Sequence, residues 1–241
     1  MPPRAVDTGI VLALNAGSSS LKFGLFAPGG DGDPALLARG QVDGIGSTPH
    51  LTAKDASSAT IAGRDWGEDK IGPDGITERL LGWIDDTFGR RLLAVGHRIV
   101  HGGSAFAAPV RLTPKIVDAL DALTPLAPLH QPLGLAPVRV LSKSRPELPQ
   151  VACFDTAFHH DLRPPVSRYA IPRRFEELGV RRYGFHGLSY EFIAARLAEI
   201  VAGLAGQAPS SRIWGTVPAF APCSMAAVSI QPWALVPSMA W

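Results

Sequence analysis

The segment Asn15–Lys22 reads Asn-Ala-Gly-Ser-Ser-Ser-Leu-Lys and brings three hydroxyl groups and one ammonium group into a short stretch of chain. Small residues let a backbone approach a ligand closely, and hydroxyl and ammonium groups bind phosphate oxygens. The spacing is not that of a P-loop, so the segment would be a different kind of phosphate-binding hairpin with a long, serine-rich tip. A solvated turn is the simpler interpretation of this segment by itself.

Arg98 and His130 are the next candidates for ligand binding. Arg98 lies near the end of an apolar stretch, shortly before the pair Gly102-Gly103. A guanidinium group can bind a carboxylate or a phosphate through two hydrogen bonds, although a structural ion pair explains this arginine equally well. His130 lies in the proline-bracketed stretch 126–132, where a single histidine is more often structural than functional.

Asp155 and His186 each lie beside a predicted element of secondary structure. Asp155 directly follows a short apolar stretch, and open α/β sheets bind ligands at the carboxyl ends of such strands. A helix cap or a tight turn accounts for Asp155 equally well. His186 precedes a helix that Ser189 is predicted to cap, and helix N-termini favour anions. The pair His159-His160 lacks metal-ligand spacing to a third residue and is predicted to lie at the surface.

The spacing of apolar residues predicts the elements that must position these side chains. Capping residues define two of the predicted helices, with Thr113 at the start of one and Ser189 at the start of another. Because strands alternate with helices, we predict an α/β protein with a domain boundary near Pro149. The predicted strands span residues 9–14, 23–26, 94–100 and 151–154, and the predicted helices span 76–88, 113–123, 133–144 and 189–201.

The composition excludes several classes of protein. The chain has 241 residues, enough for one or two domains, and its 23 basic and 21 acidic residues leave a net charge of only +2. This balance argues against a nucleic-acid-binding or membrane-adsorbing surface. No apolar stretch reaches the roughly 20 residues that a transmembrane helix needs. The two cysteines cannot form a disulfide framework or a multi-cysteine zinc site, so we expect a cytoplasmic protein.

Five segments taken together, in this order, resemble acetate kinase over residues 9–203. The resemblance implies the fold of the acetate and sugar kinase, Hsc70 and actin superfamily, an actin-like and ribonuclease H-like architecture. Its members have two similar α/β domains with a ligand cleft between them. The segments that carry the resemblance are Asn15–Lys22, Gly96–Gly103, Leu126–His130, Phe154–His159 and Tyr183–Gly187.

The resemblance also implies a reaction and roles for individual residues. The family transfers the γ-phosphoryl group of ATP to acetate, reversibly and with Mg²⁺, to give acetyl phosphate and ADP, and its members are homodimers. Leu188 and Tyr190 stand where the family usually has threonine and histidine, a departure that concerns the packing around His186 and not its identity. The implied catalytic residues are Asp155, Arg98, His186 and His130; Arg98, Val100, Leu129 and Phe185 would bind acetate; Lys22, Ser18 and Ser20 would bind the phosphates of ATP; and Asn15 would lie at the metal.

The resemblance stops after about Gly203, and only one charged residue, Arg212, follows Glu199. A shift of the reading frame by one nucleotide forces glycine codons at four places where the family has glycine. Because glycine makes up only about 7% of residues in an average protein, four such matches are not expected by chance. We therefore hypothesise a frameshift near residues 204–207. The four forced positions are Trp214-Gly215, Met225-Ala226, Trp233-Ala234 and Met239-Ala240.

This hypothesis sets the expected domain organisation. Residues 1–149 form the phosphate- and acyl-binding domain, residues 150–203 begin a second domain that is incomplete, and residues 204–241 form a poorly ordered tail foreign to the family. We expect low catalytic competence from such a chain. The alternatives are a non-catalytic remnant, such as a pseudogene product, and a sibling kinase acting on propionate or butyrate. Dimerisation stays open.

The nucleotide sequence of the gene tests the frameshift directly. We expect the shifted frame to encode His-Leu-Gly-Asn-Gly-Ala-Ser near Trp214 and Gly-Arg-Ser-Ile-Asp-Thr-Thr-Met-Gly-Phe from Met225 onward. Resequencing the same region from genomic DNA is the control for a reading error. A shifted frame without these segments contradicts the hypothesis.

Overall fold

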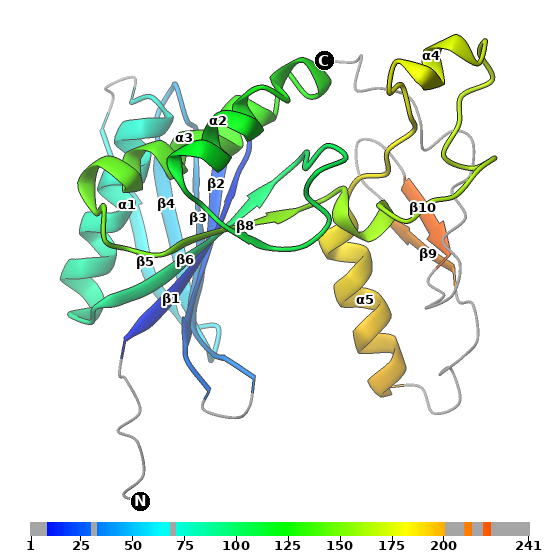
Figure 1. Ribbon diagram of the computed structural model, residues 1–241. Helices are drawn as coiled ribbons and strands as arrows, with labels where there is room; N and C mark the ends of the chain where they lie inside the picture. Colours follow the sequence, from blue (N-terminus) through cyan, green and yellow to red (C-terminus); the bar gives the residue numbers. More distant parts are fainter. Residues whose placement is uncertain (1–8, 30–32, 68–70, 201–209, 214–218, 223–241) are drawn as a thin grey trace, which may run out of the picture. The chain divides into compact units, whose positions relative to one another are not determined.

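The computed structural model describes residues 9–29, 33–67, 71–200, 210–213 and 219–222 (Figure 1). Contacts within the chain divide it into two compact units. Unit 1 comprises Met1–Ile99 and Pro109–Cys153, and unit 2 comprises Val100–Ala108 and Phe154–Trp241. The chain therefore contributes two segments to unit 2, the short excursion Val100–Ala108 and the longer segment that begins at Phe154.

Unit 1 is built on an eight-stranded mixed sheet with the order β5-β4-β3-β2-β1-β6-β8-β7. Strands β1 to β5 form a meander of antiparallel neighbours, whereas β1 and β6 run parallel. Along β1 the buried residues alternate with others, as expected for a strand with one face on the core. The strands are β1 Ile10–Ala16, β2 Ser20–Ala27, β3 Ala35–Asp43, β4 His50–Asp55, β5 Thr60–Asp65, β6 Leu92–Ile99, β7 Val110–Arg111 and β8 Gln150–Phe154.

Three helices of unit 1 pack on this sheet, α1 Pro73–Phe88, α2 Pro114–Asp121 and α3 Gln131–Ser144, with α3 beside both α1 and α2 (Figure 1). The predicted helix 76–88 is confirmed within α1, whose buried face includes Leu80 and Ile84. Thr113 caps α2 as predicted, since its side chain accepts a hydrogen bond from the Ile116 amide at 3.3 Å.

The turn between β1 and β2 differs from the prediction. The expected long tip is wrong, because the antiparallel ladder continues as far as the pairs Asn15–Lys22 and Ala16–Leu21. The tip is therefore only Gly17–Ser19, closed by a hydrogen bond from the Gly17 amide to the Ser20 carbonyl at 2.8 Å. The polar residues on either side of this tip therefore belong to the end of β1 and the start of β2.

Strands β3, β4 and β5 were not predicted. Their sequences mix charged residues and glycine with apolar ones, and all six residues of β5 are exposed or only partly buried, so periodicity alone gives a weak signal. The turn after β3 needs a glycine, because Gly44 has a φ of +73° and a Cβ atom there would lie 2.3 Å from the Thr48 carbonyl oxygen.

Unit 2 contains the helices α4 Arg174–Glu177 and α5 Gly187–Ile200 and the antiparallel pair β9 Ser210–Ile213 with β10 Ala219–Pro222. The predicted cap at Ser189 is wrong, since α5 begins at Gly187 and the His186 carbonyl already accepts from the amides of Ser189 and Tyr190. Apart from β9 and β10, the predicted tail 204–241 lies outside the described residues, as does the expectation of its poor order. None of the helices in the described ranges combines the length and apolar character of a bilayer crossing.

The core of unit 1 should depend strongly on Leu80, which is fully buried in α1. We expect Leu80→Ala to lower the free energy of unfolding by about 2–5 kcal/mol, because it removes buried methyl groups and leaves a cavity. Urea unfolding followed by circular dichroism measures this change. The matched control is Thr87→Ala on the exposed side of the same helix, with an expected change within about 0.5 kcal/mol. Equal effects of the two substitutions would contradict the assigned burial.

Candidate functional site

Asn15 and Arg98 are brought together by the pairing of β1 with β6. The parallel register sets Leu14 beside His97, so the next residues of the two strands, Asn15 and Arg98, also lie side by side. The Arg98 Nη1 atom donates a hydrogen bond to Asn15 Oδ1 at 2.9 Å, although the two residues are 83 positions apart in sequence. The pair lies where both strands end.

The remaining residues of the predicted phosphate segment surround the short turn. Lys22 is exposed on β2 and stands opposite Asn15 in the antiparallel ladder. Ser18 is exposed in the turn, and Ser20 is partly buried at the start of β2. An arginine, a lysine and two serines thus lie at or next to the same end of three neighbouring strands, β2, β1 and β6. Together these side chains could bind an anion.

His97 fixes the strand immediately before Arg98, a role that was not predicted from the residues around it. Its side chain is 1% exposed, and its Nε2 atom donates to Gln150 Oε1 at 2.9 Å. The Gln150 amide in turn donates to Ser142 Oγ of α3 at 3.0 Å, so one chain of hydrogen bonds joins β6, β8 and α3. Burial lowers the pKa of His97 to about 4, which keeps the ring neutral.

Leu129 and His130 lie directly before α3. Both side chains are exposed, and the His130 carbonyl accepts from the Gly134 amide at 2.9 Å in the first turn of the helix. A Cβ atom at Gly134 would lie 3.5 Å from the Arg98 carbonyl oxygen, so this turn packs against the end of β6. The start of α3 and the Arg98 backbone are therefore neighbours in unit 1.

Asp155, Phe185 and His186 are brought together in unit 2. Asp155 is 1% exposed directly after β8, and its carbonyl accepts from the Gly187 amide at 2.9 Å. Phe185 and His186 precede that glycine and are partly buried. Val100 is partly buried at the start of the excursion 100–108, which Thr156 anchors by accepting from the Gly102 amide at 3.0 Å.

Two buried histidines line the segment that carries Phe185, and neither was predicted to do so. His101 accepts from the Gly103 amide at 2.9 Å, and its ring packs edge-on against Tyr183 and Phe185 at centroid distances of 4.5 and 5.7 Å. Burial lowers the pKa of His101 to about 4. His159 was predicted to lie at the surface and is instead 3% exposed, because the 3₁₀ turn Ala157–His159 directs it inward.

The predicted residues thus fall into two groups on two units. Unit 1 carries Asn15, Ser18, Ser20, Lys22, Arg98, Leu129 and His130, and unit 2 carries Val100, Asp155, Phe185 and His186. Among the described residues, no group of three or more histidine, cysteine, aspartate or glutamate side chains is placed to hold a metal ion. Any metal held here would need other ligands as well, such as water or substrate phosphates.

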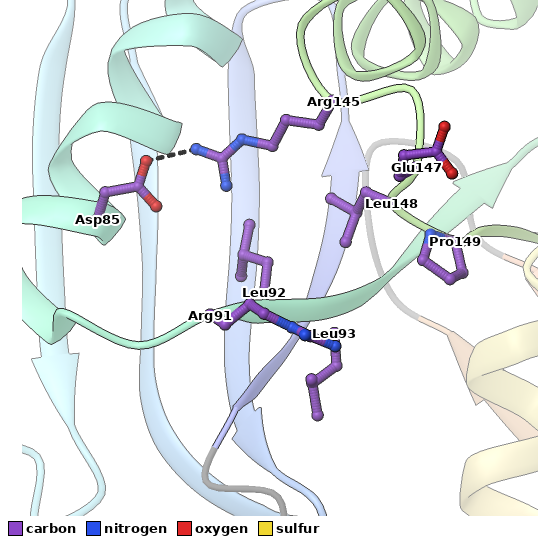
Figure 2. Close-up of a pocket in the computed structure, with 8 residues that line it drawn as sticks. All are labelled: Asp85, Arg91, Leu92, Leu93, Arg145, Glu147, Leu148 and Pro149. Atoms are coloured by element: carbon purple, nitrogen blue, oxygen red, sulfur yellow. Dashed lines mark hydrogen bonds and ion pairs between the residues drawn. The ribbon is translucent and has the colours of Figure 1, made fainter.

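Neither of two pockets in the described residues contains a predicted site residue. The pocket in unit 1 has a volume of about 530 Å³, and an ion pair between Asp85 and Arg145 lies along its wall (Figure 2). The other pocket, of about 350 Å³, lies in unit 2 between Pro165 and Val180. The lining of the first consists of Asp85, Arg91, Leu92, Leu93, Arg145, Glu147, Leu148 and Pro149.

Solved structures define the class of fold to which the chain belongs. It is similar to the acetate kinase of Porphyromonas gingivalis, with a TM-score of 0.76 and 32% identity over 92% of this chain and 56% of that one. A propionate kinase from Francisella tularensis matches with a TM-score of 0.77 and 27% identity, over the same shares of the two chains. The predicted actin-like kinase fold is confirmed.

The chain belongs to the Acetokinase family, whose model matches residues 10–208. An acetate kinase of Rhodopseudomonas palustris is 46% identical over 204 residues, which make up 83% of this chain and 49% of that protein. The chain spans about half the length of the curated relatives it matches. The predicted family is confirmed, and the matched region agrees with the extent of the resemblance.

The neutral state of His97 predicts a pH dependence of stability. Because the pKa of His97 is about 4 in the folded chain and 6.5 when unfolded, the unfolded state alone takes up a proton as the pH falls between these values. The free energy of unfolding should therefore fall by about 3 kcal/mol from pH 6.5 to pH 4 through this residue. Urea unfolding at several pH values measures the slope.

His97→Gln should flatten this slope, since glutamine keeps a hydrogen-bond donor at a similar position and does not titrate. The control is Thr87→Ala, at an exposed residue that does not titrate, which should leave the slope unchanged. An identical slope in His97→Gln and the unmodified chain would mean that His97 is protonated when folded.

Proposed function

We propose that this chain carries the acyl- and phosphate-binding part of an acetate kinase, a phosphotransferase with a carboxyl group as acceptor. The reaction moves the γ-phosphoryl group of ATP to acetate and gives acetyl phosphate and ADP, reversibly. The contact between Arg98 and Asn15 at the ends of two parallel strands carries this proposal. The acetate kinase relative that is 46% identical supports it.

The residue types suit the chemistry. A carboxylate is already a nucleophile at neutral pH, so the reaction needs no strong base. Its barrier lies in bringing two anions together, and positioned cations lower that barrier. Arg98 would hold the acetate carboxylate or the moving phosphoryl group, while Lys22, Ser18 and Ser20 would bind the phosphates of ATP.

The remaining roles concern the reacting groups and the acyl chain. We propose that His130 and His186 donate to the phosphoryl group as its charge spreads, and that Asp155 is catalytic. The almost complete burial of Asp155 supports a specific role for its carboxylate, because aspartate is seldom fully buried without partners. Val100, Leu129 and Phe185 would form the small apolar pocket for the methyl group of acetate.

Magnesium would be held mainly by the nucleotide. Mg²⁺ keeps several waters and is bound through one or two protein oxygens together with substrate phosphates. The serine hydroxyls of Ser18 and Ser20 fit this mode of binding. Asn15 Oδ1 already accepts from Arg98, so Asn15 fits best as an indirect neighbour of the ion. When bound, the ion would neutralise phosphate charge.

We also propose that residues 1–149 act as the phosphate- and acyl-binding domain and that residues 150–203 begin the second domain. A cytoplasmic location is consistent with the nearly neutral charge of the chain. The similarity to a propionate kinase favours, as a second candidate, a kinase for a slightly longer acid. The half-length match favours, as a third, a fragment that binds without turnover.

Arg98 should control any turnover. In a hydroxamate assay with acetate and Mg-ATP, we expect the purified chain to be far slower than the Rhodopseudomonas palustris acetate kinase assayed beside it. Arg98→Ala should reduce the remaining rate about 100-fold, the loss typical of one donor to a developing anion. The control, Arg111→Ala at an exposed arginine of β7, should change nothing.

The outcomes separate the candidates. Faster turnover with propionate or butyrate than with acetate supports the sibling kinase. No turnover from a chain with a folded circular dichroism spectrum supports the non-catalytic fragment. Turnover that survives Arg98→Ala contradicts the proposed site.

A further inference from the structure

We propose that His159 is a positioning residue, which fixes the backbone of Phe185 and His186 by donating its Nε2 hydrogen to the Phe185 carbonyl. The inference deepens the proposed function and rests on it, because Phe185 and His186 matter for catalysis only if they belong to the acetate kinase site. The contact itself lies wholly within unit 2.

The hydrogen bond determines the state of the ring. His159 Nε2 lies 3.0 Å from the Phe185 carbonyl oxygen, which can only accept. The hydrogen must therefore be on Nε2, and Nδ1 of a neutral ring is then an acceptor. Among the described residues this buried Nδ1 atom has no hydrogen-bond partner. Within the described residues, the His159 ring thus makes one hydrogen bond, which goes to the Phe185 carbonyl.

The electrostatic surroundings agree with a neutral ring. Burial lowers the pKa of His159, and the nearby His186 lowers it further. The Phe185 carbonyl and Asp155 act in the opposite direction, with a smaller effect than that of burial. His159 therefore interacts with Phe185, His186 and Asp155 at once, although it was not predicted to be part of the site.

The ring also fills a closely packed space. Its edge meets Phe158 and Tyr190 at centroid distances of 5.1 and 5.7 Å. A Cβ atom at Gly184 would lie 2.3 Å from His159 Cγ, so the chain passes the imidazole at a distance that only glycine allows. Tyr190, which departs from the family pattern, thus packs against His159.

His186 shows why its backbone needs such support. Its φ is +59°, in the left-handed region that residues other than glycine seldom adopt, and such a conformation persists only when neighbouring contacts enforce it. On one side the Phe185 carbonyl accepts from His159, and on the other the Gly187 amide donates to the Asp155 carbonyl at 2.9 Å. The short segment 155–159 therefore holds the backbone of His186 from both sides.

Two substitutions separate the hydrogen bond from the packing. His159→Phe keeps an aromatic ring but has no donor, whereas His159→Gln keeps a nitrogen donor at the same number of bonds from the backbone. The control is His50→Gln in unit 1. All are made in the full chain, and folding is checked by circular dichroism and by amide protection in β1.

The first measurement is long-range ¹H–¹⁵N NMR of the histidine side chains. We expect the His159 signals of a neutral ring with hydrogen on Nε2. The second is amide hydrogen exchange at Gly187. We expect protection to fall about tenfold in His159→Phe, the order that one buried hydrogen bond contributes to local opening, and to recover in His159→Gln.

Neither measurement requires turnover, so both decide the positioning role even if no variant makes acetyl phosphate. A charged ring, or hydrogen on Nδ1, overturns the proposal. So does unchanged protection at Gly187 in His159→Phe, or a folded His159→Gln that recovers none of it. If His159→Phe fails to fold, the tautomer and the protection in His159→Gln decide. Where the chain does turn over, we expect the kcat of His159→Phe to fall and to be restored in His159→Gln.

Discussion

The parallel pairing of β1 with β6 is the constraint on which the candidate site of unit 1 depends. It sets the ends of two strands level with each other, although they are far apart in sequence, and so delivers Arg98 to Asn15. The helix start at His130 reaches the same region, because the first turn of α3 packs against the end of β6 at Gly134. A slip of one residue in this register would send the Arg98 side chain to the opposite face of the sheet.

Buried neutral histidines recur beside the proposed functional residues. His97 precedes Arg98, His101 packs on Phe185, and His159 donates to the Phe185 carbonyl. An imidazole suits this task, since it fills space like an aromatic ring and still offers one directed donor. Their neutrality has a physical cause, which is burial that disfavours the charged form. The histidines thus shape the site without carrying charge into it.

Local features of the chain could be predicted from sequence, and distant contacts could not. The spacing of apolar residues in α1 and the cap at Thr113 are properties of neighbouring residues, and both predictions are confirmed. The burial of His159 depends on Phe185, which is 26 positions away, so its own neighbours gave no signal. The polar residues after the apolar part of β1 predict a long turn, because only the pairing partner shows that Asn15 and Lys22 belong to strands.

The early excursion of the chain into unit 2 has a consequence for synthesis. Val100–Ala108 leaves the ribosome before the residues it packs against, since Phe106 stacks on Phe154 and His101 contacts Tyr183. While α2 and α3 are being synthesised, the ring of Phe106 therefore stays exposed, because Phe154 has not yet been made. Unit 2 is therefore not a separable module that a cut after Cys153 would release intact. A fragment starting at Phe154 would lack two of the rings around which its own loops are arranged.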